Sequence, residues 1–249
     1  MHFAIIAAGQ GSRLHQEGIA LPKPLVQIGG KPLTGRLIDL FIACRAESVS
    51  VIINEQAAEV DRYLMSLSLP VPLHITRLTT PGSMHSLAAM NLARLGGKVI
   101  VTTVDTVFAP REFEAYCREF ETSHDTDAMM AVTRYIDDEK PLYVVTRPGT
   151  MEVTDFADAP AEGSELFASG GIYGLTPRAL SILDHCLAQG MTRMRRYQRA
   201  LVQQSLTVRA VEFSKIIDVD HAADIPKAER LLDDIPDITH SINQTPFTK

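Results

Sequence analysis

The sequence has little cysteine, and the cysteines it has do not form a recognisable pattern. Cys44, Cys117 and Cys186 are odd in number, lie far apart and include no C-x-x-C pair. This spacing indicates neither a disulfide framework nor a zinc site. We therefore expect buried thiols in a reducing compartment.

Long apolar runs and an excess of positive charge are also absent. No run approaches the roughly 20 apolar residues of a membrane helix. The first apolar run, residues 3–8, follows no basic segment and stops at Gly9, unlike a signal peptide. With 24 Lys and Arg against 30 Asp and Glu, the formal charge of −6 has the wrong sign for a nucleic-acid binder. These absences predict a cytoplasmic protein without a membrane or nucleic-acid partner.

What the 249 residues do contain is an average globular composition, 45% hydrophobic and 22% charged. Short apolar runs predict strands covered on both faces, at 3–8, 48–54, 73–77 and 98–104. Apolar residues at helical spacing lie between them, and Thr176, Pro177 and Gly190 mark the two ends of a further helix. A last helix follows Asp224. This alternation predicts an α/β fold with a mostly parallel mixed sheet flanked by helices.

The middle of the chain departs from this alternation. Strand-like segments follow one another there without a helix, at 128–133, 142–146, 151–156 and 168–175. Such a run predicts antiparallel additions to the sheet. Since no linker-like tract separates them, we expect one domain over residues 1–249, with an antiparallel insertion around 127–175. The polar tail after Asp237 is expected to be loosely ordered.

The most informative segment is a glycine-rich turn after the first strand, where residues 7–14 read AAGQGSRL. Such a turn presents backbone N–H groups to phosphate, and Arg13 and Lys23 add positive charge. The alternative is an ordinary turn with two solvent-exposed cations. Two rival phosphate motifs fail. Leu14 replaces the third glycine of a dinucleotide fingerprint, and Lys31 precedes a proline rather than the Ser or Thr of a Walker loop.

Three motifs together resemble the start of the sugar-nucleotide pyrophosphorylase, or nucleotidyltransferase, superfamily. They are GQGSRL at 9–14, PKPL at 22–25 and KPL at 31–33. The resemblance implies a Rossmann-like, GT-A-like fold and a transferase of NDP-sugar biosynthesis. It implies that Arg13 contacts the triphosphate of an NTP and that Lys23 faces the α-phosphate. The nucleotide-binding residues that it implies are Ala7, Ala8, Gly9, Gly11, Ser12, Gly82 and Ser83.

The same resemblance implies a metal site formed at strand ends. Asp105 follows the strand at 98–104, although an aspartate there is also a common turn residue. Asp218 and Asp220 end a later strand, Asp218 being the first choice as ligand and Asp220 the second. Mg²⁺ binds well to a few carboxylates when substrate phosphates and waters complete its shell. We therefore expect Mg²⁺ held by Asp105 with Asp218 or Asp220.

The acceptor side of the sequence resembles the family less closely. Residues 167–173, FASGGIY, resemble the acceptor-side strand and imply contacts from Gly170, Gly171 and Tyr173. Where many relatives carry Glu-Lys-Pro, this chain reads FADAP at 156–160. The ending IDVD at 217–220 also resembles cytidylyltransferases that act on phosphocholine. The basic run at 193–196 either binds an acceptor phosphate or is a solvated helix face.

The sequence therefore predicts a Mg²⁺-dependent nucleotidyltransferase. It would transfer an NMP from an NTP to a sugar 1-phosphate or similar phosphomonoester and release pyrophosphate. Three alternatives stay open: a cytidylyltransferase for a small phosphomonoester such as phosphocholine, a metal-dependent glycosyltransferase using Asp218 and Asp220, and a catalytically silent nucleotide-sugar sensor. The base, the acceptor and the formation of a homo-oligomer are not specified by the sequence.

Overall fold

A computed structural model describes residues 1–160 and 165–233, so the tail expected after Asp237 lies outside the described residues. Four parallel strands form one half of the main sheet, in the order β6 (Val99–Thr103), β1 (His2–Ala7), β4 (Val49–Ile53) and β5 (Leu73–Arg77). All four coincide with the apolar runs of the sequence. Every residue of β4 is buried, as expected for a strand with helices on both faces.

The other half of the sheet is mostly antiparallel. β11 (Phe167–Leu175) pairs antiparallel with β6 and so joins the two halves. β8 (Ala128–Thr133) lies antiparallel to β11 and parallel to β12 (Val208–Phe213). β9 (Tyr143–Thr146) and β10 (Val153–Ala157) form a hairpin on the start of β11. The predicted antiparallel segments thus belong to the same sheet, and the predicted mixed α/β architecture is confirmed.

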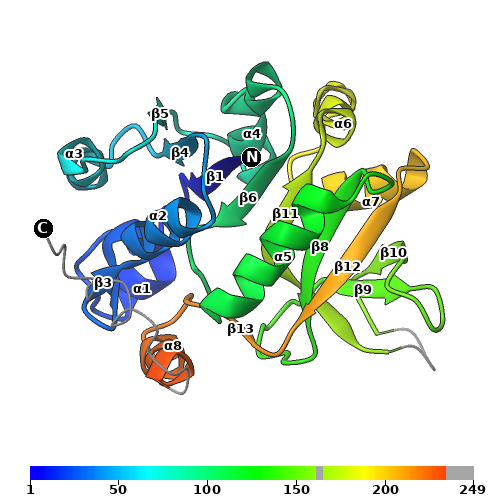
Figure 1. Cartoon of the computed structure of the whole chain (residues 1–249). Coiled ribbons are helices and arrows are strands. Elements are labelled where there is room, and N and C mark those ends of the chain that lie inside the picture. Colours follow the sequence, from blue (N-terminus) through cyan, green and yellow to red (C-terminus); the bar gives the residue numbers. More distant parts are fainter. Residues whose placement is uncertain (161–164, 234–249) are drawn as a thin grey trace, which may run out of the picture.

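Helices cover both faces of this sheet (Figure 1). One face packs on α2 (Leu33–Ala43), α3 (Ala58–Ser66), α5 (Pro110–Thr122) and α8 (Asp224–Asp233). The other face packs on α4 (Ser83–Ala89), α6 (Pro177–Ala188) and α7 (Met194–Gln203). Side chains of β1 alternate between the two cores, Phe3 and Ile5 entering one and Ala4 and Ile6 the other. No helix within 1–160 and 165–233 is long and apolar enough to cross a membrane.

Short elements outside the main sheet determine where the polar residues meet. α1 (Ser12–Gln16) and the 3-10 turn η1 (Lys23–Leu25) follow β1, and a further 3-10 turn, η2 (Leu92–Leu95), precedes β6. β2 (Gln27–Ile28) pairs with β3 (Lys31–Pro32). β7 (Thr106–Phe108) follows β6 and pairs antiparallel with β13 (Ile216–Asp218). Through the pairing of β13 with β7, the segment that follows β13 lies next to the glycine turn after β1.

Candidate active site

The glycine turn after β1 brings the backbone close to Lys23. Gly11 has a φ of +60°, a left-handed conformation that glycine adopts readily and other residues rarely. A Cβ at this position would lie 2.8 Å from the Cβ of Lys23. α1 starts at the next residue and leaves the side chain of Arg13 51% exposed. Position 11 therefore favours glycine for two reasons, the left-handed backbone of the turn and the close approach of Lys23.

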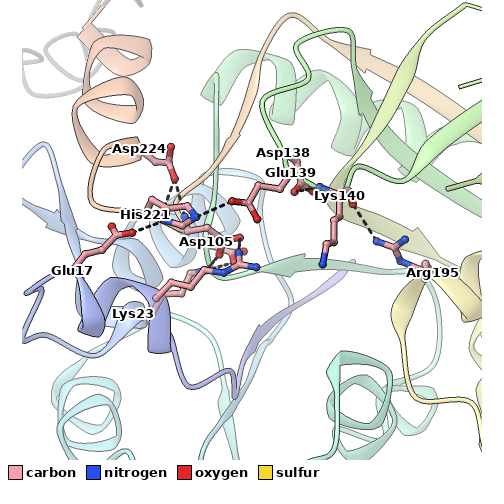
Figure 2. Close-up of polar contacts among 11 residues, drawn as sticks. Glu17, Lys23, Asp105, Asp138, Glu139, Lys140, Arg195, His221 and Asp224 are labelled. Atoms are coloured by element: carbon pink, nitrogen blue, oxygen red, sulfur yellow. Dashed lines mark hydrogen bonds and ion pairs between the residues drawn. The ribbon is translucent and has the colours of Figure 1, made fainter. Parts of the chain in front are cut away.

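Lys23 joins two carboxylates that come from distant parts of the chain. Its Nζ lies 2.5 Å from Asp105 Oδ2 and 2.5 Å from Asp220 Oδ1. Asp105 follows β6, and Asp220 follows β13. Arg13 Nη1 donates to the second oxygen of Asp220 at 3.0 Å. These four residues form what we call the lysine–aspartate network, and Figure 2 shows Lys23 directed toward Asp105.

The network is charged although it is largely enclosed. The Lys23 side chain is only 10% exposed, so it is not the solvent-exposed cation of the alternative interpretation. Burial disfavours its charge, but Asp105 and Asp220 outweigh burial and raise the pKa of Lys23. Burial likewise opposes the charge on Asp105, yet Lys23 and a hydrogen bond from Thr103 lower the pKa of Asp105. Both partners are therefore ionised at neutral pH.

Asp218 lies beside the network and outside its ion pairs. Its Oδ1 accepts a 3.3 Å hydrogen bond from Thr106 Oγ1. The side chain is open to a cavity, but enclosure by the surrounding protein, together with the charges of Asp105 and Asp220, raises the pKa of Asp218 to about 8. Asp218 is therefore mostly protonated at neutral pH, unlike Asp105.

The carboxylates can be tested as ligands of a divalent metal. In the part of the chain that the structure describes, no group of three or more His, Cys, Asp and Glu is arranged to hold a metal. Asp105 and Asp220 nevertheless face one cation, the ammonium of Lys23, with one oxygen each. Two carboxylates suit Mg²⁺ when phosphate oxygens and waters supply the remaining ligands. The residues present fit a metal site that the substrate completes.

Two adjoining cavities meet at the lysine–aspartate network. The first, the glycine-turn cavity, has a volume of about 440 Å³. Nearly all residues that the sequence assigned to nucleotide and catalysis line it: Ala8, Gly9, Gly11, Ser12, Arg13, Lys23, Gly82, Ser83 and Asp105. Ala7 instead lines a further cavity on the other side of the turn. The glycine turn and the start of α4 thus enclose one space.

The second cavity, which we call the acidic cavity, has a volume of about 370 Å³ and shares Arg13 and Asp220 with the first. It lies between β11, the loop 134–141, the segment after β13, and α8. Its acidic lining residues are Asp137, Asp138, Glu139, Asp218, Asp220 and Asp224. No role was predicted for residues 137–139, although their three consecutive acidic side chains are a visible signal in the sequence.

Of the three predicted acceptor contacts, only Gly170 lines the acidic cavity. Gly171 has a φ of +72°, and a Cβ there would lie 2.6 Å from Thr103 Oγ1. Tyr173 is 6% exposed and packs in the core of the α4, α6 and α7 face. The structure therefore places Gly171 and Tyr173 in supporting positions beneath the site, where packing rather than acceptor contact explains the residue type.

The basic run at 193–196 does not reach either cavity. Arg195 donates to Asp158 Oδ1 at 2.5 Å and to the carbonyl oxygen of Lys140 at 3.2 Å. Arg199 lies 2.8 Å from the other oxygen of Asp158. Asp158 stands in the segment FADAP at 156–160. In this chain the segment ties α7 to the hairpin of β9 and β10.

One contact that the sequence did not predict anchors the segment carrying Asp220. His221 Nδ1 lies 2.6 Å from Glu17 Oε1, and the backbone N–H of Ala222 donates to Glu17 Oε2 at 2.6 Å. The hydrogen bond to Glu17 is the main reason that the pKa of His221 is raised. Figure 2 shows Glu17, His221 and Asp224 on one side of Lys23. Glu17 therefore connects α1 with the returning chain.

A glycine turn after a parallel strand, paired cations, and carboxylates that follow β6 and β13 define a nucleotide-binding α/β protein. More particularly, residues 3–202 match the MobA-like NTP transferase domain, and the chain belongs to that family. Mannose-1-phosphate guanyltransferase of Yarrowia lipolytica is 23% identical over 187 residues, covering 72% of this chain and 50% of that protein. CMP-5'-(3-aminopropyl)phosphonate synthase of Streptomyces rubellomurinus is 23% identical over 168 residues, covering 61% and 27%. The chain thus spans about half or less of these relatives.

The fold is also found in solved structures. The inositol-1-phosphate CTP transferase from T. maritima superposes with a TM-score of 0.74 at 14% identity, covering 92% of this chain and 95% of that one. At this identity the likeness concerns the fold alone. It confirms the Rossmann-like nucleotidyltransferase architecture that the motifs implied.

Proposed function

We propose that this chain is a nucleotidyltransferase that transfers an NMP from an NTP to a phosphomonoester and releases pyrophosphate. The observation that carries the proposal is the lysine–aspartate network, which stands where the glycine-turn cavity and the acidic cavity meet. Membership of the NTP transferase family supports it. So do the names of the relatives, which describe guanylyl transfer to mannose 1-phosphate and synthesis of a CMP-linked phosphonate.

The glycine-turn cavity is the proposed NTP site. In this proposal, backbone N–H groups of the turn and the exposed guanidinium of Arg13, which line the cavity, bind the triphosphate. Lys23 lines the same cavity at its border with the acidic cavity, where the α-phosphate would meet the acceptor. Gly82 and Ser83, at the start of α4, are the proposed contacts for the nucleoside.

The chemistry needs little from protein side chains beyond charge and position. An oxygen of the acceptor phosphate attacks the α-phosphorus, the bond from that phosphorus to the β-phosphate oxygen breaks, and pyrophosphate leaves. Because a phosphate oxygen is already ionised near neutral pH, no general base is required. Lys23 and Arg13 stabilise the negative charge that spreads over the transferring group.

Asp105 and Asp220 are the residues we propose to hold Mg²⁺, with Asp218 as a neighbouring carboxylate. This reverses the order suggested by the sequence, because Asp220, not Asp218, faces Lys23 and Arg13. The metal supplies positive charge that offsets the charge of the phosphates. We further infer that the chain works as one nucleotidyltransferase domain, since the antiparallel strands that border the acidic cavity continue the sheet that carries the glycine turn.

The test is pyrophosphate release, measured with each of the four NTPs against a panel of phosphomonoesters, with Mg²⁺ and with EDTA. We expect release only when an NTP, an acceptor and Mg²⁺ are present together. Binding of a nucleotide sugar without any release would instead support the sensor. Release of a nucleoside diphosphate from a nucleotide sugar would support the glycosyltransferase.

A further inference from the structure

Among the described residues, acidic side chains outnumber lysine and arginine in the lining of the acidic cavity, whereas the two kinds are equal in number in the glycine-turn cavity. The acidic cavity opens beside the lysine–aspartate network, with which it shares Arg13 and Asp220. If the NTP occupies the glycine-turn cavity, as the proposed function has it, the acceptor occupies the acidic cavity. The inference below rests on that assignment. The chemistry of this cavity then describes the acceptor.

Counting charges shows that the cavity is strongly negative. Six acidic residues line it; Asp218, whose pKa is raised to about 8, is mostly protonated at neutral pH, so five carboxylates stand against two permanently charged cations, Arg13 and Lys227. Both cations are already paired. Arg13 binds Asp220, and Lys227 Nζ lies 2.6 Å from Asp137 and 3.1 Å from Asp224. An acceptor phosphate adds further negative charge to this surrounding.

The excess charge is concentrated on one wall. In the described residues neither Asp138 nor Glu139 forms an ion pair with a lysine or arginine side chain. Asp138 Oδ1 accepts a hydrogen bond from the backbone N–H of Lys140 at 2.9 Å, and Glu139 lies 4.0 Å from His221 Nε2. Both belong to the loop 134–141 and are exposed to solvent. Figure 2 shows them in the region of His221, away from the tip of Lys23. The cavity therefore has a cationic end at the network and an anionic wall at the loop.

An aromatic residue of the same loop already contacts a positive group. The ammonium of Lys215 lies over the ring of Tyr135, 4.1 Å from its centre, and Tyr135 lines the cavity. Aromatic faces and carboxylates together are the surroundings that bind amines and quaternary ammonium groups. Carboxylates also accept hydrogen bonds from sugar hydroxyls, but a neutral sugar would leave the excess negative charge beside the phosphate uncompensated.

We propose that the acceptor is zwitterionic, a small phosphomonoester or phosphonate whose other end carries an amine or quaternary ammonium group facing Asp138 and Glu139. The phosphate end lies against Arg13 and Lys23. Charge separation of this kind selects the orientation that presents a phosphate oxygen to the α-phosphorus. It also selects against anionic sugar phosphates, because recognition depends on repulsion of the wrong ligand as well as attraction of the right one.

The experiment compares acceptors that differ in one charge. Pyrophosphate release is measured with the preferred NTP and with phosphoethanolamine, phosphocholine, ethyl phosphate, glucose 1-phosphate and mannose 1-phosphate. We expect kcat/KM to be at least about tenfold higher for phosphoethanolamine and phosphocholine than for the three acceptors without an amine. A tenfold difference corresponds to the loss of one ionic contact. Ethyl phosphate is the matched control, because it resembles phosphoethanolamine without the amine.

Variants locate the effect. The double variant Asp138→Asn with Glu139→Gln is expected to raise KM for phosphoethanolamine about tenfold with little change in kcat, and to leave KM for ethyl phosphate and the NTP unchanged. Asp184→Asn is the control for loss of an exposed carboxylate elsewhere, since Asp184 is an exposed residue of α6 that lines neither cavity. Melting temperatures verify that the variants fold.

The outcomes separate the two proposals. Efficient turnover of a sugar 1-phosphate with little turnover of the cationic acceptors would overturn the zwitterionic acceptor and leave the proposed function intact. Equal loss of activity toward ethyl phosphate and phosphoethanolamine in the double variant would also overturn it. No pyrophosphate release with any NTP and any acceptor would overturn the proposed function, and this inference with it.

Discussion

Lys23 lines the glycine-turn cavity and joins two carboxylates from distant parts of the chain. Its ammonium neutralises Asp105 and Asp220, which would otherwise repel each other at close range. The same ammonium is the proposed contact of the α-phosphate. We therefore expect this one side chain to contribute both to the stability of the folded protein and to its activity, and the two contributions can be measured separately.

Replacing this lysine should reduce both quantities. We expect Lys23→Ala to lower kcat by a factor of about 10² to 10³, as for loss of one preorganised electrostatic contact. The free energy of unfolding should fall by about 1 to 3 kcal/mol, because two carboxylates lose their partner. Pyrophosphate-release kinetics and urea unfolding give the two numbers. Lys31→Ala, which removes a 62% exposed lysine, is the control and should change neither. A normal kcat in Lys23→Ala would disprove the catalytic role.

Gly11 can be tested by adding a single methyl group. Gly11→Ala should cost about 1 to 2 kcal/mol of stability for the left-handed backbone. It should also weaken NTP binding, because the new Cβ would lie 2.8 Å from Lys23. Gly149→Ala is the matched control, since Gly149 has a φ of +73° but a Cβ there would meet nothing within 4 Å. Calorimetric titration with NTP should therefore distinguish the two variants, although both lose stability. Equal NTP affinity would remove the phosphate-binding assignment.

The three aspartates should differ in a defined order. We expect Asp105→Asn and Asp220→Asn each to abolish most activity, and the double variant to lose little more, because residues that act as a unit are non-additive. Asp218→Asn should lose less, because Asp218 is outside the ion pairs of Lys23. The measurement is kcat over a range of Mg²⁺ concentrations. A larger loss in Asp218→Asn than in Asp220→Asn would restore the order that the sequence suggested.

At the scale of helices and strands, apolar patterning and end signals were sufficient for most of the sheet. The segments 73–77 and 128–133 coincide with β5 and β8, because a run of apolar residues between polar ends has few alternatives in a covered sheet. Thr176 does begin α6 and Gly190 does follow its end. These signals act within one turn of the chain, so the sequence displays them directly.

Contacts between distant elements were not predictable in this way. The sequence did not predict α7 as a helix with a buried face. The polar Gln198 is one of its buried residues and interrupts the apolar pattern that would have indicated that face. The partners of Lys23 are 82 and 197 residues away. The family resemblance placed Lys23 and the aspartates in one active site but gave no ion pairs between them. The wall formed by 137–139 depends on the position of a loop, which no periodic pattern encodes.

The start of α6 provides a test at this scale. The Thr176 hydroxyl accepts a hydrogen bond from the backbone N–H of Ala179 and donates to the carbonyl oxygen of Asp127 at 2.8 Å. Thr176→Ala should therefore reduce the free energy of unfolding by about 1 kcal/mol, and Thr176→Ser should retain most of it. Activity should not change, since Thr176 lines neither cavity. Urea unfolding of both variants is the measurement, and equal stability of the two would contradict the capping role.

At the scale of the whole molecule, the returning segment after β13 is held to α1 by Glu17 and His221, and this link depends on pH. The pKa of His221 is raised from 6.5, so its contribution is complete below about pH 6.5 and is lost as pH rises through the folded value. The pKa of Glu17 is lowered from 4.5, so its contribution is present above about pH 4.5 and is lost as pH falls through the folded value. The link should therefore be strongest between these two pH values.

The comparison of wild type with Glu17→Gln tests this link, since other titrating groups cancel in the difference. The variant should melt at a lower temperature, with the largest gap near pH 5.5 and a smaller gap near pH 9. High salt should reduce the gap, because both side chains are exposed to solvent. A gap that is the same at both pH values would show that the ionic link does not contribute.

The return of the chain to its first turn also has a consequence for the protein during its synthesis. Lys23 and Asp105 are 82 residues apart, whereas Asp220 is 197 residues from Lys23. At roughly 5 to 20 residues per second, Asp220 leaves the ribosome roughly 6 to 23 s after Asp105. Until then Lys23 has one carboxylate partner, and the acidic cavity lacks the wall formed by α8. A nascent chain that has already folded its parallel strands therefore still lacks part of the proposed site, and we expect activity only when β13 and α8 are in place.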